Sequence, residues 1–178
     1  MRIRRGRPPK LALEGAEAGL METLAKQLIE VFDVEDSSGD VRDPLESLIG
    51  PVDNGEAATD PVMMRLLPDA YTDDDEAAIE WRRFGRSEVR SAKLDSCRLV
   101  LSDCGVEGPV TIELDDEHLS AWLGVLTDLR LALAIRLDIT EDWVQDALRL
   151  EEGDPRRSAY EIYEWLSITQ SHLVDVAG

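Results

Sequence analysis

The stretch EHLSAWLGVLTDLRLALAIRL, residues 117–137, decides the fold. Its large apolar residues recur at helical spacing and form one stripe, made of Leu119, Trp122, Leu126, Leu129 and Leu133. A second side carries small groups that would let another helix approach closely, namely Ala121, Gly124, Asp128 and Ala132. Because a helix that is apolar on two sides belongs in a core, this stretch predicts the central helix of the fold.

The segments around this helix carry their own start and stop signals. Asp115 or Asp116 is placed to cap the central helix. Asp60, before Pro61, and Ser87 are placed to cap earlier helices, and Thr140 a later one, with Ile139 and Val144 at hydrophobic-staple spacing. The apolar spacing and caps predict further helices at 16–33, 60–67, 74–84, 87–104, 140–150 and 155–174.

Strand patterns appear at two places. Residues 2–5 and 10–14 alternate on either side of the turn residues Gly6–Pro9, which predicts a hairpin within residues 1–14. Val110–Leu114 alternates as a further strand, and we expect it to share one small sheet with the hairpin. Residues 36–59 are rich in Asp, Gly and Pro, so a mobile loop is expected there.

Together these patterns predict an α+β fold, mostly α, in a single domain over residues 1–178. Five or six helices are expected to form a compact bundle around the central buried helix, accompanied by the hairpin and one further strand.

The charge of the chain is strongly negative but uneven. Thirty-eight acidic residues stand against nineteen basic ones, for a net charge of -19. Five of the cations lie within the first ten residues, at Arg2, Arg4, Arg5, Arg7 and Lys10. Such a field argues against non-specific binding of nucleic acid or anionic lipid, and it favours solubility or a basic partner.

Two further observations concern the compartment. Pro8 and Pro9 follow the basic N-terminus where a signal peptide would be apolar, and the charges within 117–137 would be costly in a bilayer, so we expect a cytoplasmic protein without a membrane segment. Cys97 and Cys104 lie about 10.5 Å apart along a regular helix, too far for a disulfide, and are predicted to be buried free thiols.

The segment Arg4–Lys10, RRGRPPK, carries the sharpest motif. It is similar to an AT-hook, in which an extended Arg-Gly-Arg-Pro core places its arginines in the minor groove of A·T-rich DNA. The candidate nucleic-acid segment is therefore Arg4, Arg5, Arg7 and Lys10. The alternative is a basic hairpin turn, because a single copy on so acidic a chain would be repelled by phosphates.

The sequence offers no constellation for catalysis or for a metal. There is no nucleophile elbow, no Gly-rich phosphate loop and no paired-His zinc spacing, and the run Asp73–Glu76 is interpreted as helix capping. We therefore expect no cofactor and no metal, and the protein is predicted not to be an enzyme.

Charged residues within apolar patterns form the second candidate site. Asp128 and Arg130 lie in the helix expected to be most buried, where an unpaired charge is costly, so both should be paired, with the helix after Ser87 among the candidate partners. The candidate interaction or ion-pair cluster consists of Arg65, Asp69, Tyr71, Arg82, Arg83, Asp128, Arg130 and Arg136. These residues either fix helix register or line a cleft that reads a carboxylate or phosphate.

Three blocks of the sequence resemble an uncharacterised actinobacterial domain-of-unknown-function family. The first holds Asp60-Pro61, RLLPDAY at 65–71 and EWRR at 80–83; the second holds LTDLRL at 126–131 with Arg136 to Glu141; the third holds YEWL at 163–166 with Gln170-Ser171. The resemblance implies a cytosolic protein whose gene often neighbours that of the protease adaptor ClpS, with no catalytic residues to carry over.

These features predict a regulatory or adaptor protein that binds an unknown protein partner, and the family resemblance implies a link to regulated proteolysis. One alternative is a DNA-binding accessory protein that uses Arg4–Lys10. Another is an enzyme or ligand binder with an arginine-lined anion cleft. A homodimer formed through an exposed aromatic face near Tyr160, Tyr163 and Trp165 is also consistent with the pattern.

Overall fold

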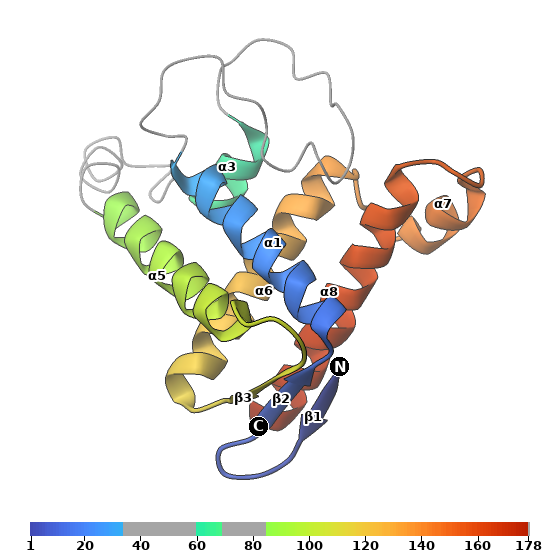
Figure 1. Cartoon of the computed structure of the whole chain (residues 1–178). Coiled ribbons are helices and arrows are strands. Elements are labelled where there is room, and N and C mark those ends of the chain that lie inside the picture. The colour runs from blue at the N-terminus through green and yellow to red at the C-terminus, as the bar shows by residue number, and fades with distance from the viewer. Residues whose placement is uncertain (34–59, 69–84, 178) are drawn as a thin grey trace.

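The structure, a computed structural model, describes residues 1–33, 60–68 and 85–177. Four long helices lie side by side, a small sheet closes one end of the bundle, and two short helices lie toward the other end (Figure 1). The described elements, in chain order, are β1 (Arg2–Arg4), β2 (Lys10–Leu13), α1 (Gly15–Asp33), α3 (Pro61–Leu66), α5 (Arg86–Cys104), β3 (Val110–Glu113), α6 (Asp116–Arg136), α7 (Trp143–Arg149) and α8 (Arg156–Ala177).

Helix α6 is the centre of the bundle, as its sequence predicts. It packs against α5, α8, α3 and α1, and its apolar stripe is buried at Trp122, Leu126, Leu129 and Leu133. On its second side Ala121, Asp128 and Ala132 are buried as well. By length and composition alone α6 could also cross a membrane, the one such helix in the described part of the chain. Here its apolar side chains instead contact the neighbouring helices.

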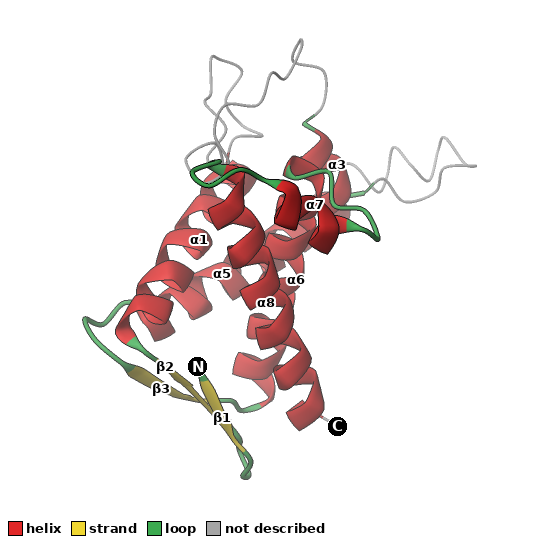
Figure 2. Ribbon diagram, turned by 90° about the vertical axis from the view of Figure 1, so that its right-hand side faces the viewer, coloured by secondary structure: helices red, strands yellow, loops and turns green. Residues whose placement is uncertain are grey.

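The sheet is antiparallel in the order β1-β2-β3. The hairpin pairs Ile3 with Leu11, and β2 in turn pairs Leu11 with Ile112, so the two strand patterns of the sequence do share one sheet. Leu11 and Leu13 are buried against the helices, which cover one face of the sheet (Figure 2). The predicted α+β, mostly α, architecture is confirmed.

Two predicted helix starts are wrong. Helix α5 begins at Arg86 with Gly85 as N-cap, so Ser87 lies inside the first turn and is not the cap. Helix α7 begins at Trp143, three residues after Thr140. The Thr140 hydroxyl accepts a bond from the Asp142 N–H and shapes a turn before the helix. Val144 is 48 % exposed, so it makes no hydrophobic staple.

The Asp60 cap is confirmed, since its carboxylate accepts a bond from the Val62 N–H at 3.0 Å. Asp115 caps α6 in the same way through the His118 N–H. The predicted mobile loop at 36–59 and helix at 74–84 lie outside the described residues.

Candidate functional site

The structure describes only four of the eight residues of the predicted charged cluster. Asp69, Tyr71, Arg82 and Arg83 lie outside the described residues. Of the other four, Arg65 is exposed on α3, while Asp128, Arg130 and Arg136 all lie on α6.

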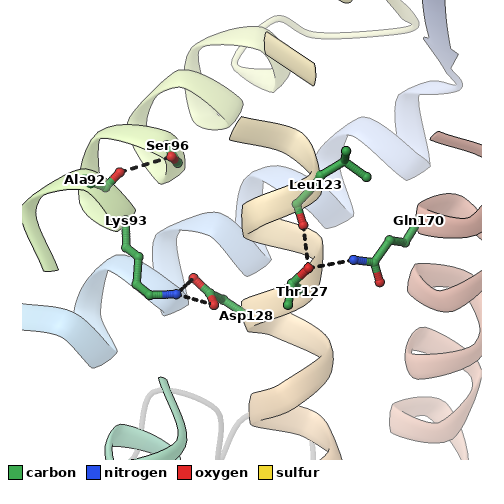
Figure 3. A network of polar contacts seen from close by, with 7 residues as sticks. All are labelled: Ala92, Lys93, Ser96, Leu123, Thr127, Asp128 and Gln170. Atoms are coloured by element: carbon green, nitrogen blue, oxygen red, sulfur yellow. Dashed lines mark hydrogen bonds and ion pairs between the residues drawn. The ribbon is translucent and has the colours of Figure 1, made fainter. Parts of the chain in front are cut away.

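Asp128 faces α5 and binds Lys93. Both carboxylate oxygens accept hydrogen bonds from the Lys93 ammonium, at 2.6 and 2.8 Å (Figure 3). Asp128 is 4 % exposed, so the pair is screened from water on the carboxylate side. Burial raises the pKa of the Asp128 carboxyl above its ordinary value, and the Lys93 ammonium opposes that shift. The predicted pairing of Asp128 with the helix after Ser87 is confirmed.

Arg130 faces α8 and has no carboxylate within ion-pair distance among the described residues. Its guanidinium donates to the Ser167 hydroxyl at 2.9 Å and to the Gln170 side-chain oxygen, and it lies 5.6 Å from the centre of the Tyr163 ring. Gln170 also donates to the Thr127 hydroxyl at 2.6 Å (Figure 3). The charge pairing expected for Arg130 is not found among the described residues, because neutral polar groups and an aromatic ring hold its guanidinium instead.

Arg136 faces α3. It donates to both oxygens of Asp60, at 3.1 and 3.2 Å, so the same carboxylate caps α3 and anchors the end of α6. Asp128, Arg130 and Arg136 therefore contact three different neighbours of α6. The described members of the predicted cluster are not gathered in one cleft.

The sequence reasoning missed the partners Lys93, Ser167 and Gln170. Lys93 is 35 residues from Asp128 in the chain, and an exposed-looking lysine on an amphipathic helix gives no local signal of such a pairing. The tertiary arrangement alone brings the two side chains together.

A second polar group ties the start of α6 to the end of α5. The Trp122 indole N–H donates to Asp103 at 2.8 Å, and the His118 ring lies between Asp115 at 2.8 Å and Asp103 at 3.6 Å. The hydrogen bond with Asp115 raises the pKa of His118 above its ordinary value, helped by the negative charges of Asp103, Asp115 and Glu117 and opposed by partial burial. Neither histidine-aspartate contact was expected from the sequence.

The two cysteines are free and buried, as predicted. Burial raises the pKa of each thiol to about 12; the charge of Asp128 adds to the effect at Cys97, and that of Asp103 at Cys104. Since the thiolate is the reactive form, neither side chain is a ready nucleophile at neutral pH.

The candidate nucleic-acid segment forms the turn of the β1–β2 hairpin. Arg4 lies opposite Lys10 in the register, and Lys10 pairs with Glu113 of β3. The four exposed arginines Arg2, Arg4, Arg5 and Arg7, here called the basic tip, have no acid within ion-pair distance in the described part of the chain. The segment is folded back on itself rather than extended.

Helix α7 covers two of the three aromatic residues of α8, Tyr160 and Tyr163. The Trp143 ring stacks parallel to Tyr160, with centres 6.2 Å apart, and meets Tyr163 edge-on at 5.4 Å. Tyr160 is 8 % exposed, and its hydroxyl donates to the Leu137 carbonyl. Of the aromatic face that the sequence suggested for a homodimer, Tyr160 is therefore buried within the chain itself, while Tyr163 and Trp165 stay half-buried.

Comparison with known proteins identifies the family. The profile of a family described as a domain of unknown function, DUF2017, matches residues 1–177. The chain belongs to the DUF2017 family. It is similar to the oxidative stress regulator AosR of Mycobacterium tuberculosis, at 32 % identity over 172 residues that cover 89 % of this chain and 77 % of the relative. The AosR of Mycobacterium bovis matches equally, and the putative AosR of Mycobacterium leprae matches at 30 % identity with the same coverage.

No solved structure matches the chain. The contacts of this DUF2017 member nevertheless explain why the three sequence blocks go together. Asp60 of the first block binds Arg136 of the second, and Thr127 and Arg130 of the second bind Gln170 of the third. Described residues of the three blocks thus make polar contacts that hold α3 and α8 against α6.

Proposed function

We propose that this DUF2017 member is a regulatory protein of the oxidative-stress response that acts by binding another protein rather than by catalysing a reaction. Its similarity to relatives named oxidative stress regulators supports the regulatory role. The role in stress comes from those names alone, and the mode of action comes from this chain's own residues.

The proposed mode of action rests on one observation: the potentially reactive groups in the interior of the bundle are paired with each other or buried. Asp128 is bound to Lys93 between two helices, Arg136 to Asp60, and the two thiols are buried in their neutral form. In enzymes such groups serve as acids, bases or nucleophiles. In this bundle the charged groups hold helices together and the thiols are part of the core. What remains available to other molecules is the surface, which in an acidic chain with a basic tip is unevenly charged.

We extend the proposal to the cellular compartment and to the biological process in which the protein acts. The resemblance to a family whose genes often neighbour that of the protease adaptor ClpS favours regulated proteolysis as the setting, in the cytoplasm. In that setting the protein would deliver or withhold a partner from degradation according to the oxidative state of the cell.

Capture experiments test this proposal. The full chain, tagged and expressed in its own cells, is recovered before and after a pulse of hydrogen peroxide. We expect one protein in stoichiometric amounts, with a recovery that changes after peroxide, and we expect cells lacking the gene to survive peroxide differently. An unchanged survival together with no stoichiometric partner would contradict the proposal.

A second candidate function is supported by the basic tip. Four exposed arginines without acidic partners are a feature of phosphate-binding surfaces, and their turn sequence is similar to an AT-hook. In this reading the protein binds A·T-rich DNA and the acidic bundle faces away from the duplex.

Titration of a labelled A·T-rich duplex at physiological salt tests the second candidate. The matched variant is Arg4→Ala/Arg5→Ala/Arg7→Ala and not a deletion of residues 1–10, because Ile3 and Lys10 pair with strand neighbours and the N-terminal amine binds Glu17. If the duplex binds the natural chain, the triple variant should lose that binding and keep its thermal unfolding. No binding by the natural chain excludes this function.

A further inference from the structure

Helix α7 is apolar on two neighbouring sides, yet the bundle covers only one of them. Trp143, Ala147 and Leu150 pack partly against the core. On the other side Val144 and Leu148, one helical turn apart, are 48 % and 68 % exposed. Isolated exposed apolar side chains are ordinary, but here two large ones form a ridge along one turn of a helix with no fully buried residue.

The charges around the ridge are negative and uncompensated. Glu141 and Asp142 precede it and Glu151 and Glu152 follow it; all four are exposed, and none has a cation within ion-pair distance among the described residues. Two of the nearby cations are already used, since Arg149 binds Asp146 and Arg156 binds Asp154. Arg157, in the first turn of α8, is exposed as well, so the acids outnumber the remaining cations. A surface hollow lined by residues 149–156 continues from the end of the ridge.

We propose that α7 is a docking site for a basic amphipathic helix of a partner protein. Such a helix would lay its apolar side along Val144 and Leu148 and place lysines or arginines near the acids at either end of the ridge. This inference rests on the proposed function and names the class of partner segment that the regulatory protein would recognise.

Charge and shape disfavour the other occupants. A nucleic acid or an anionic membrane would be repelled by the four acids. The most basic surface that a second copy of the chain could offer is its basic tip, but the turn Arg4–Lys10 contains no large apolar side chain to match the ridge. Within one molecule the tip and α7 lie at opposite ends of the bundle (Figure 1).

The first experiment uses a model helix as the probe. A fluorescent peptide of Leu and Lys, with its leucines on one face, is titrated with the full chain, and a peptide with Glu in place of every Lys is the control. We expect weak binding of the Leu/Lys peptide, because the ridge is small compared with a stable interface, and no binding of the Leu/Glu peptide.

Matched substitutions then locate the site. Leu148→Ser removes half of the ridge without changing charge, and we expect at least about tenfold weaker binding of the Leu/Lys peptide. The control is Val106→Ser, which removes a side chain of similar exposure, 65 %, at the sheet end of the molecule and should leave binding unchanged. Glu151→Gln/Glu152→Gln should weaken binding more than Glu107→Gln/Asp175→Asn, which removes the same charge elsewhere.

The outcomes separate this proposal from the proposed function. If Leu148→Ser and Val106→Ser bind the peptide equally well, the peptide reads only the overall negative charge and the α7 site is wrong. If sedimentation shows a dimer of the natural chain that Leu148→Ser dissociates, the ridge belongs to a second copy and the proposal is also wrong. In either case the capture experiment can still recover a stoichiometric, peroxide-sensitive partner. The regulatory function would then hold, and the partner would bind another surface of the protein.

Discussion

Helices α6 and α7 follow one another in the chain, and both are apolar on two sides, but the fold uses them in opposite ways. Four helices cover α6, and polar contacts hold it at its start, its middle and its end, through His118, Asp128 and Arg136. Helix α7 has one covered side and is held through the ring contacts of Trp143.

The difference shows that two apolar sides do not by themselves mean burial. In α6 the charged residues within the pattern find partners on α5, α8 and α3, so the helix is fixed in rotation as well as in place. In α7 the charged pair Asp146–Arg149 forms within the helix itself and fixes it to no neighbour, and the second apolar side stays open. Substitutions that remove a contact of either helix test this difference. The expected loss of stability is largest in the middle of α6, intermediate at α7 and smallest at the start of α6.

Lys93→Ala should have the largest effect. It leaves the 4 % exposed Asp128 carboxylate without its cation in the middle of the bundle, which costs about 3–5 kcal/mol of unfolding free energy. Urea unfolding at pH 7 measures this cost.

Two comparisons sharpen this test. Lys26→Ala removes an exposed pair with Glu22 on one helix and should change stability by less than about 0.5 kcal/mol. Lys93→Met/Asp128→Leu replaces the buried pair by apolar side chains of similar size and should recover most of the loss. If Lys93→Ala costs no more than Lys26→Ala, the contact does not fix α6 as argued.

Trp143→Ala should have an intermediate effect that is confined to α7. It removes the contacts with Tyr160 and Tyr163, which we expect to cost about 1–2 kcal/mol because the ring is only partly buried. Hydrogen exchange should show the amides of α7 losing protection while those of α6 keep theirs. Equal loss of protection in both helices would mean that α7 is an integral part of the bundle.

The sequence predicted those parts of the fold that depend on local periodicity. The α6 stripe, the alternation in β2 and β3 and the Asp60 and Asp115 caps all follow from residue spacing. The starts of α5 and α7 were missed because Ser87 and Thr140 are good caps by residue type, whereas the chain direction set by neighbouring helices decides which residue caps.

The candidate site was predicted less well, for a physical reason. Burial of Asp128 follows from its helix, and so does the need for a cation, but the choice of Lys93 depends on how α5 lies across α6. Val144 of the ridge was misread as the staple partner of Ile139, because periodicity counts apolar positions and does not say which of them a neighbour covers.

The smallest expected effect is a pH dependence at the start of α6, where His118 faces Asp103 of α5 and Asp115 and Glu117 of its own turn. Their hydrogen bond and charges raise the pKa of His118 above its unfolded value, so protonated His118 stabilises the fold. That stabilisation is fully present below about pH 6.5 and is lost as the pH rises through the folded pKa. Between pH 6 and pH 9 the urea midpoint of the natural chain should therefore fall more steeply than that of His118→Asn. The general repulsion of an acidic chain is common to both proteins and cancels in the difference. Parallel curves would mean that His118 contributes nothing to holding α5 and α6 together, and that the Trp122–Asp103 bond alone ties this end of α6 to α5.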